Sequence, residues 1–230
     1  IIYTGSMNAF SDPFGAGGFG LDGADTDYEI PAQPERGIWF GLSIDTDPNS
    51  GRIYIAFVDQ SDLDANADAG SALDHHDTDV FVMASDDNGA TRGALSASPD
   101  IAVGNAAWQT LNPGVGLVRV NNVLDANASQ FFAWLDVDEK TGNLAVGWYD
   151  ARNDTGALGT GGQLNAIAND EVEYFAALST TSGLSWSEDI LVSDSFSSAF
   201  QSDDVHYGDY TGIVFVDDML HMTWADNSNT

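Results

Sequence analysis

The sequence predicts an all-β fold assembled from copies of one antiparallel sheet. Two observations support this: short apolar runs rich in aromatic and branched residues alternate with polar turns, and the layout of one hairpin is repeated along the chain. The hairpin is clearest at 130–154, where two apolar strands flank the turn at 138–143. Gly142 in this turn can adopt the positive φ that a tight hairpin turn requires.

Two further stretches have the layout of this hairpin. Residues 38–59 share its turn and end positions at a constant offset of 91 residues, without a gap. Residues 213–226 form a shorter copy around the turn at 217–218. A shared offset at four positions indicates an internal repeat. The paired positions are Asp45 and Asp136, Asp47 and Asp138, Gly51 and Gly142, and Asp59 and Asp150.

Each copy of the repeat is predicted to contain about four short strands. Strands at 79–85 and 117–121 follow the first hairpin, and strands at 174–178 and 189–193 follow the second. The chain is divided accordingly. Residues 1–37 are an irregular arm rich in glycine and aspartate, 38–121 the first copy with an insertion at 93–116, 122–193 the second copy, and 194–230 the start of a third.

The chain carries a strong negative charge. It has 36 acidic and 6 basic residues, which gives a formal net charge of −30. Such a surface repels phosphate backbones and anionic headgroups, so nucleic-acid binding and membrane insertion are not expected. High salt or bound divalent cations would relieve the self-repulsion. The charge therefore favours a saline environment, calcium binding, or both.

The sequence lacks the residues that several kinds of chemistry require. It has no cysteine, which excludes disulfides and thiolate chemistry. No apolar run reaches the roughly eighteen residues of a membrane span. Residues 1–3 do not resemble a signal peptide, so we expect any export signal to have been removed. No nucleotide-binding fingerprint occurs, and no organic cofactor is expected.

Residues 85–91 and 179–186 resemble the Asp box, the repeat of bacterial neuraminidases. The first stretch matches up to Arg92, which stands where tryptophan is usual, and the second has Thr181 and Ser185 in place of aspartate and threonine. Such a turn needs glycine for positive φ, a short polar side chain for the backbone NH groups, and an aromatic anchor. The matching residues are Ser85, Asp87, Gly89 and Thr91, and Ser179, Gly183 and Trp186.

This resemblance implies a sialidase-like β-propeller with four-stranded antiparallel blades. The chain would supply two full blades and part of a third, an incomplete propeller, because closed propellers have about four or more blades. We expect the remainder of a longer chain or another subunit to close it. A β-sandwich would also account for the strands, but not for the repeated order of hairpin, strand and box.

The resemblance also implies a chemistry. Sialidases of this fold hold the carboxylate of their substrate with three arginines, and they use a tyrosine paired with a glutamate as nucleophile and an aspartate as acid/base. Of the five arginines here, Arg152 alone is predicted at a strand end that faces a functional surface. One arginine does not form such a cluster, so sialidase activity is not expected from this segment.

We therefore expect an extracellular or cell-surface module that binds a glycan or a protein partner and is stabilised by calcium. Aromatic rings at loop edges can stack on sugars beside a planar donor. Two alternatives remain open: a sialidase-like glycoside hydrolase whose catalytic residues lie partly outside this segment, and a structural cell-surface module. The predicted ligand-binding residues are Tyr149, Arg152, Tyr207 and Tyr210.

Two Asp-rich stretches are candidates for calcium. In 62–68 a carboxylate or amide falls on every second residue, as in a calcium loop, although Ala67 stands where that loop has glycine. A solvated loop is the alternative there. In 74–79 carboxylates surround His75 and His76, and we expect calcium on the carboxylates rather than a transition metal on the histidines. The candidate ligands are Asp62, Asp64, Asn66 and Asp68, and Asp74, Asp77 and Asp79.

Three aspartates, Asp59, Asp150 and Asp226, recur at the ends of equivalent strands. Such carboxylates could gather around a central axis as acid or base groups. A catalytic site seldom uses the same residue from each repeat. We therefore interpret them as caps of the loops that follow, with Asp150 able to pair with Arg152.

Overall fold

The computed structural model describes residues 41–59, 78–86, 118–122, 128–157, 166, 170–198, 207–208 and 210–228. Within these ranges the regular structure is β-sheet, and all paired strands are antiparallel. Nothing in the same ranges forms a helix that could cross a bilayer. The prediction of an all-β, antiparallel fold is therefore confirmed.

The first sheet is a four-stranded meander. In both chain order and spatial order its strands are β1 (Ser43–Thr46), β2 (Ile53–Asp59), β3 (Asp79–Ser85) and β4 (Val118–Arg119). Strands β1 and β2 form the predicted hairpin, whose turn contains Gly51 at a φ of +75°. The carboxylate of Asp47 stabilises this turn by accepting the backbone NH of Asn49 at 2.9 Å.

The second sheet repeats this meander. Its strands are β5 (Gln130–Val137), β6 (Leu144–Asp150), β7 (Glu171–Ser179) and β8 (Ile190–Leu191), and β9 (Ser197–Ser198) pairs separately with β7. The turn between β5 and β6 contains Gly142 at a φ of +74°, and Asp138 accepts the backbone NH of Lys140 there at 2.9 Å. Asp138 thus has the role that Asp47 has in the first hairpin. The equivalence predicted from the offset of 91 residues is confirmed in these two turns.

The third sheet is the hairpin of β10 (Gly212–Val216) and β11 (Met219–Thr223). Its turn is made by Asp217 and Asp218, at φ values of 51° and 61°. A two-residue turn with positive φ at both positions matches the twist of the flanking strands, and aspartate is among the residues that tolerate it. The predicted third hairpin is therefore present.

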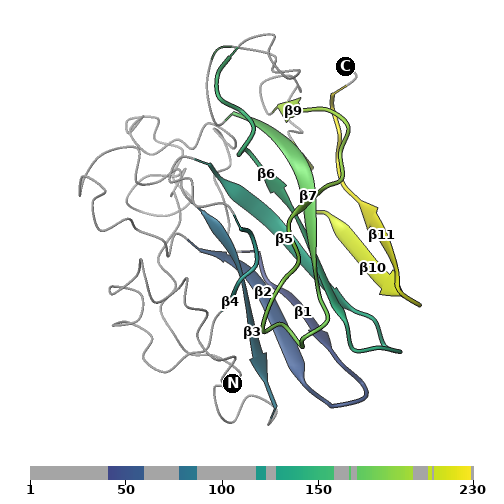
Figure 1. Ribbon diagram of the computed structural model, residues 1–230. Helices are drawn as coiled ribbons and strands as arrows, with labels where there is room; N and C mark the ends of the chain where they lie inside the picture. Colours follow the sequence, from purple (N-terminus) through teal and green to yellow (C-terminus); the bar gives the residue numbers. More distant parts are fainter. Residues whose placement is uncertain are drawn as a thin grey trace, which may run out of the picture.

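The three sheets follow one another across the molecule in chain order, from the blue strands through the green to the yellow (Figure 1). Strand β5 packs on β1 and β2, and β10 packs on β5 and β6. Tyr54, Leu135 and Trp148 are fully buried in the core cluster of the first two sheets. Each such side chain stabilises the fold by roughly 1.5–3 kcal/mol. Successive antiparallel sheets packed face to face are the blades of an incomplete β-propeller.

Aspartates of the repeat also join each sheet to the next. Asp45 Oδ2 in β1 accepts the backbone NH of Val137 in β5 at 2.8 Å. Asp136 Oδ2, which lies 91 residues later, accepts the backbone NH of Phe215 in β10 at 2.6 Å. A buried NH left unpaired would cost about 1–3 kcal/mol. The repeated aspartates are therefore contacts between sheets as well as caps within turns.

An aromatic cluster lies in the core around Tyr149 of β6. The ring of Tyr149 lies 5.4 Å from that of Phe131, 5.1 Å from that of Tyr174 and 5.0 Å from that of Tyr207, centroid to centroid. The hydroxyl of Tyr149 donates to the carbonyl of Ala225 at 2.7 Å, beyond the end of β11. Burial raises the pKa of Tyr174 to about 12. The cluster thus joins the second sheet to the third hairpin.

Candidate functional site

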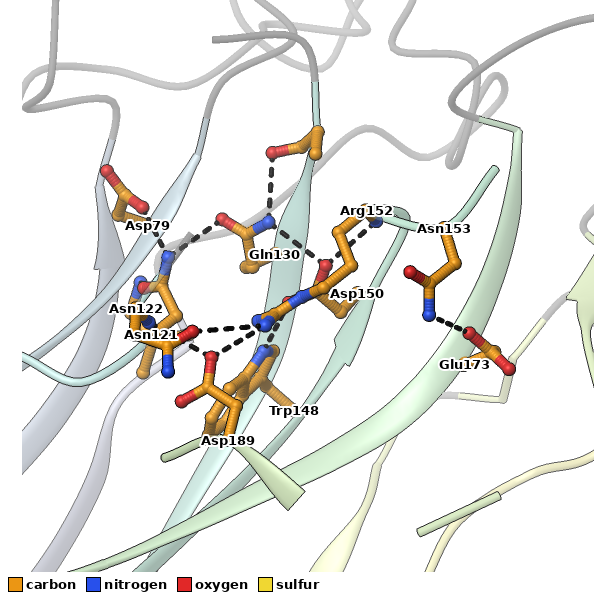
Figure 2. Close-up of polar contacts among 12 residues, drawn as sticks. Asp79, Asn121, Asn122, Gln130, Trp148, Asp150, Arg152, Asn153, Glu173 and Asp189 are labelled. Carbon is orange, nitrogen blue, oxygen red and sulfur yellow. Dashed lines mark hydrogen bonds and ion pairs between the residues drawn. The ribbon is translucent and has the colours of Figure 1, made fainter. Parts of the chain in front are cut away.

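A network of polar side chains lies where β5 begins and β6 ends (Figure 2). The strand register places Gln130 directly opposite Asp150, and both residues are buried. A buried carboxylate is costly unless donors surround it. Asp150 accepts hydrogen bonds from Trp148 Nε1 at 2.7 Å, from Gln130 Nε2 at 3.2 Å and from the backbone NH of Arg152 at 2.9 Å.

The guanidinium of Arg152 holds two carboxylates together. Its Nη2 lies 2.5 Å from Asp150 Oδ2, and its Nη1 lies 2.7 Å from Asp189 Oδ2. The guanidinium carbon also lies 4.3 Å from the centre of the Phe175 ring, in cation–π geometry. Burial opposes the charge of Arg152, but the two carboxylates outweigh it and the pKa of Arg152 is raised. The predicted pairing of Asp150 with Arg152 is confirmed.

Asn122, which follows β4 of the first sheet, contacts both Arg152 and Asp189. Its backbone NH donates to Asp189 Oδ2 at 3.0 Å, and its Nδ2 donates to Glu188 Oε2 at 2.9 Å. Its Oδ1 accepts a hydrogen bond from Arg152 Nη1 at 3.4 Å. The end of the first sheet is therefore tied to the segment that leads into β8.

The neighbouring Asn121 closes the network from inside the first sheet. Its Nδ2 donates to Asp79 Oδ1 at 2.6 Å and to Gln130 Oε1 at 3.3 Å. Arg119 Nη1 lies 3.4 Å from the other carboxylate oxygen of Asp79. Contacts thus run without interruption from β3 of the first sheet, through Gln130, to Arg152 in the second (Figure 2).

Glu173 is a further carboxylate at this edge. It stands opposite Asp150 in the register of β6 and β7, and its Oε2 accepts a hydrogen bond from Asn153 Nδ2 at 2.6 Å. Burial raises the pKa of Glu173, and the charge of Asp150 adds to the effect, whereas the hydrogen bond from Asn153 opposes it. Burial likewise raises the pKa of Asp189.

The structure separates the four predicted ligand-binding residues. Tyr149 and Tyr207 are buried in the aromatic cluster, so neither lines an accessible surface in this structure. Arg152 is mostly buried and is held by two carboxylates. Tyr210 is 78% exposed. Only Tyr149 and Tyr207 are in direct ring contact, so the four residues do not form one binding surface.

Most of the predicted calcium ligands lie outside the described residues. Asp79 is described: it is buried at the start of β3, and its carboxylate accepts from Asn121 and pairs with Arg119. Within the described ranges no group of three or more acidic or histidine side chains is placed to hold a metal. The ligands that lie outside are Asp62, Asp64, Asn66, Asp68, Asp74 and Asp77.

The turn at 179–186 has the geometry that its structural role requires. Gly183 has a φ of +80°, and Ser179 Oγ accepts its backbone NH at 2.9 Å. Thr181 Oγ1 accepts the backbone NH of Ser185 at 2.9 Å, in the position where the Asp box has a carboxylate. Trp186 packs on the core between the sheets. In the other stretch Ser85 is buried at the end of β3, and Asp87, Gly89 and Thr91 lie outside the described residues.

The recurring aspartates that can be compared have the same local role. Asp150 accepts the backbone NH of Arg152 at 2.9 Å, and Asp226 accepts that of Ser228 at 2.8 Å, two residues further on in both cases. The side chain of Asp59, at the end of β2, lies outside the described part of the chain. Asp150 and Asp226 therefore cap the loops that follow their strands.

Every lysine and arginine in the described ranges forms an ion pair. Each of these cations is therefore already paired with at least one carboxylate. Arg36 and Arg92 lie outside those ranges. The pairs are Arg52 with Asp86, Arg119 with Asp79, Lys140 with Asp217, and Arg152 with Asp150 and Asp189.

Sequence reasoning found Arg152 and Asp150 but missed their partners. Asn121, Asn122 and Gln130 border predicted strands without forming a motif, and Asp189 was assigned only to an outer strand. The one available signal was the arginine itself, because a buried guanidinium needs carboxylate partners.

Two solved structures resemble this chain over part of their length. One is the Hadza microbial sialidase Hz136, with a TM-score of 0.39 and 17% sequence identity, where the alignment covers 65% of this chain and 25% of that protein. The other is the polysaccharide lyase Uly1, with a TM-score of 0.36 and 10% identity, where the alignment covers 82% of this chain and 36% of the lyase. No protein-family model and no curated protein matches the chain. The chain therefore spans about a quarter of the sialidase and about a third of the lyase.

Proposed function

We propose that this chain is part of an extracellular, sialidase-like β-propeller module that binds a glycan without cleaving it. The proposal rests on a contrast between two of the predicted ligand-binding residues. Arg152 is held by Asp150 and Asp189, whereas Tyr210 is 78% exposed. A ring stacked on a sugar needs no charge. We therefore expect a neutral glycan rather than a carboxylate sugar.

The surface charge supports an extracellular, saline setting for this module. A net charge of −30 keeps a chain soluble and repels anionic surfaces, and it is best tolerated where salt or calcium screens it.

The proposal also includes calcium binding by the Asp-rich stretches 62–68 and 74–79. Removal of calcium with EGTA is expected to lower the melting temperature, and magnesium at equal concentration should not restore it. An unchanged melting temperature would remove calcium from the proposal.

A glycan array probed with the chain and with Tyr210→Ala tests the binding function. Wild-type protein is expected to bind neutral glycans, and Tyr210→Ala to bind them about two- to twelvefold more weakly, which corresponds to the roughly 0.5–1.5 kcal/mol of an aromatic contact. Leu184→Ala, at another exposed apolar side chain, is the matched control and should bind as wild type does.

Three results would contradict the proposed function. Equal binding by Tyr210→Ala and wild type would show that this ring is not part of the surface. Turnover of a fluorogenic sialoside would instead support a glycoside hydrolase, and binding to no glycan would favour a protein partner or a structural role.

A further inference from the structure

Gly41, Phe132 and Tyr210 occupy the same position of the repeat. Gly41 and Phe132 are 91 residues apart, which is the offset of the first two hairpins. Tyr210 lies five residues before Phe215, as Phe132 lies five before Val137. The backbone NH groups of Val137 and Phe215 make the same contact with an aspartate of the preceding sheet. This position therefore has an aromatic ring in the second and third sheets and none in the first.

The backbone at this position favours glycine in the first two sheets. Gly41 has a φ of +38°, and Phe132 has a φ of +52°. Phe132 lies in the bulge of β5, between Phe131 and Trp134, where the register with β6 shifts. A bulky side chain at positive φ is strained, whereas glycine is not. The first sheet thus has the residue that this conformation prefers, and the second sheet has a phenyl ring there in spite of the strain.

Packing in the core accounts for only part of the Phe132 ring. Phe131 beside it is fully buried, whereas Phe132 is half-buried, although β5 packs on strands of the sheets before and after it. The ring of Phe132 lies 5.5 Å from that of Phe131 and 6.2 Å from that of Tyr149, edge to face in both cases. Bulges redirect side chains, and strained residues cluster at binding and active sites. The exposed part of Phe132 is therefore a candidate contact for a ligand.

Phe132 and Tyr210 stand side by side at the edge that holds the polar network. Thr211, the residue after Tyr210, donates from its Oγ1 to the carbonyl of Phe132 at 3.1 Å. Gln130, two residues before Phe132, is the member of the network that donates to Asp150. The two aromatic residues thus precede or begin neighbouring strands at one end of the molecule.

We propose that Phe132 and Tyr210 each stack on one sugar ring, so that this edge binds a linear glycan of at least two neutral units. The inference rests on the proposed function and adds Phe132 and the length of the glycan to it. An aromatic ring and a pyranose ring are similar in size, so two aromatic residues provide places for two units. The net charge of −30 disfavours anionic polysaccharides.

Titration calorimetry of the full chain with neutral sugars of increasing length tests the proposal. The probes are glucose, mannose, galactose and xylose, each as the single sugar and as linear oligomers of two to four units. Wild type is expected to bind a two-unit oligomer about two- to twelvefold more tightly than the single sugar, which is the contribution of one further aromatic contact.

Variants at Phe132 should remove this gain in affinity without unfolding the chain. Phe132→Gly removes the ring and introduces the residue that stands at position 41, so it should bind the two-unit oligomer no more tightly than the single sugar. Phe132→Asn replaces it if that variant folds poorly, because asparagine also tolerates positive φ. Phe132→Tyr keeps the ring and should bind as wild type does. Trp134→Leu, which removes another half-buried ring from β5, is the control and should keep the gain.

Three outcomes would overturn the inference. If Phe132→Gly and Phe132→Asn gain as much affinity from the second unit as wild type does, the ring only fills the core, and the proposed function stands without it. If Trp134→Leu loses the gain as well, a general loss of packing explains the result. If wild type binds none of these sugars, the proposed function fails together with this inference.

Discussion

Replacing Arg152 by methionine is expected to lower the free energy of unfolding by about 3–5 kcal/mol. The side chain of Arg152 pairs with Asp150 and Asp189, and both carboxylates are almost completely shielded from water. Methionine fills much of the same volume but leaves two buried carboxylates without their cation. The loss of the charge partner, rather than a cavity, therefore determines the effect.

The variant's response to pH separates this explanation from a loss of packing. The pKa of Asp189 is already raised by burial, and Arg152 opposes that shift, so removing the arginine raises the pKa further. A carboxyl whose pKa is raised in the folded state favours folding below its unfolded pKa of about 3.9 and loses that contribution as pH rises through the folded pKa. The destabilisation of Arg152→Met should thus be smaller near pH 4 than at pH 7.

Urea unfolding at both pH values measures this effect. Lys140→Met is the matched control, because Lys140 pairs with Asp217 at a similar distance but with both side chains exposed, and such pairs contribute little. Its unfolding midpoint should remain that of wild type. An Arg152→Met variant as stable as wild type, or equally destabilised at both pH values, would contradict the ion-pair account.

The strands could be predicted from the sequence because each hairpin is encoded locally. Gly51 and Gly142 both have the positive φ that their turns require, and the alternation around them determines the pairing. The bulge at Phe132, whose φ is +52°, and the short strand β9 have no such local signal. Both depend on contacts with distant segments, which a pattern along the chain does not contain.

The candidate site could be predicted only in part, for a related reason. Arg152 and Asp150 are two residues apart, so their pairing follows from proximity. Asp189 and Asn122 are distant in sequence from Arg152 and join it only because β7 and β8 return to the same edge and the first sheet ends beside it. Residues that come together only when the chain folds have no fixed separation in the sequence, so their contact cannot be predicted from a motif.

The positions of the tyrosines show a further limit of pattern reasoning. Tyr149 is the next-to-last residue of β6, a strand that is buried along its whole length. An aromatic residue at the end of such a strand has the same sequence pattern as one that faces solvent. Tyr149 and Tyr207 are therefore core residues, although their neighbours in sequence suggested a loop edge.

Gly147→Ala is expected to destabilise the fold by about 1–3 kcal/mol through overpacking. A Cβ atom at this position of β6 would lie 2.8 Å from Ile213 Cδ1 and 3.0 Å from Tyr174 Oη. Ile213 is the residue that β10 buries against the second sheet. The added methyl group would therefore push the third hairpin away from its neighbour, and the cost arises at the junction between sheets rather than within β6.

A double-mutant cycle with Ile213→Val tests this origin. Valine lacks the Cδ1 atom that meets the new methyl group, and alone it should cost about 0.5–1.5 kcal/mol. If the clash is the cause, Gly147→Ala combined with Ile213→Val costs less than the sum of the two single variants, because part of the overlap is gone. Additive free energies of unfolding in urea would instead place the effect of Gly147→Ala in the backbone of β6 and would contradict the close packing of β10 on this glycine.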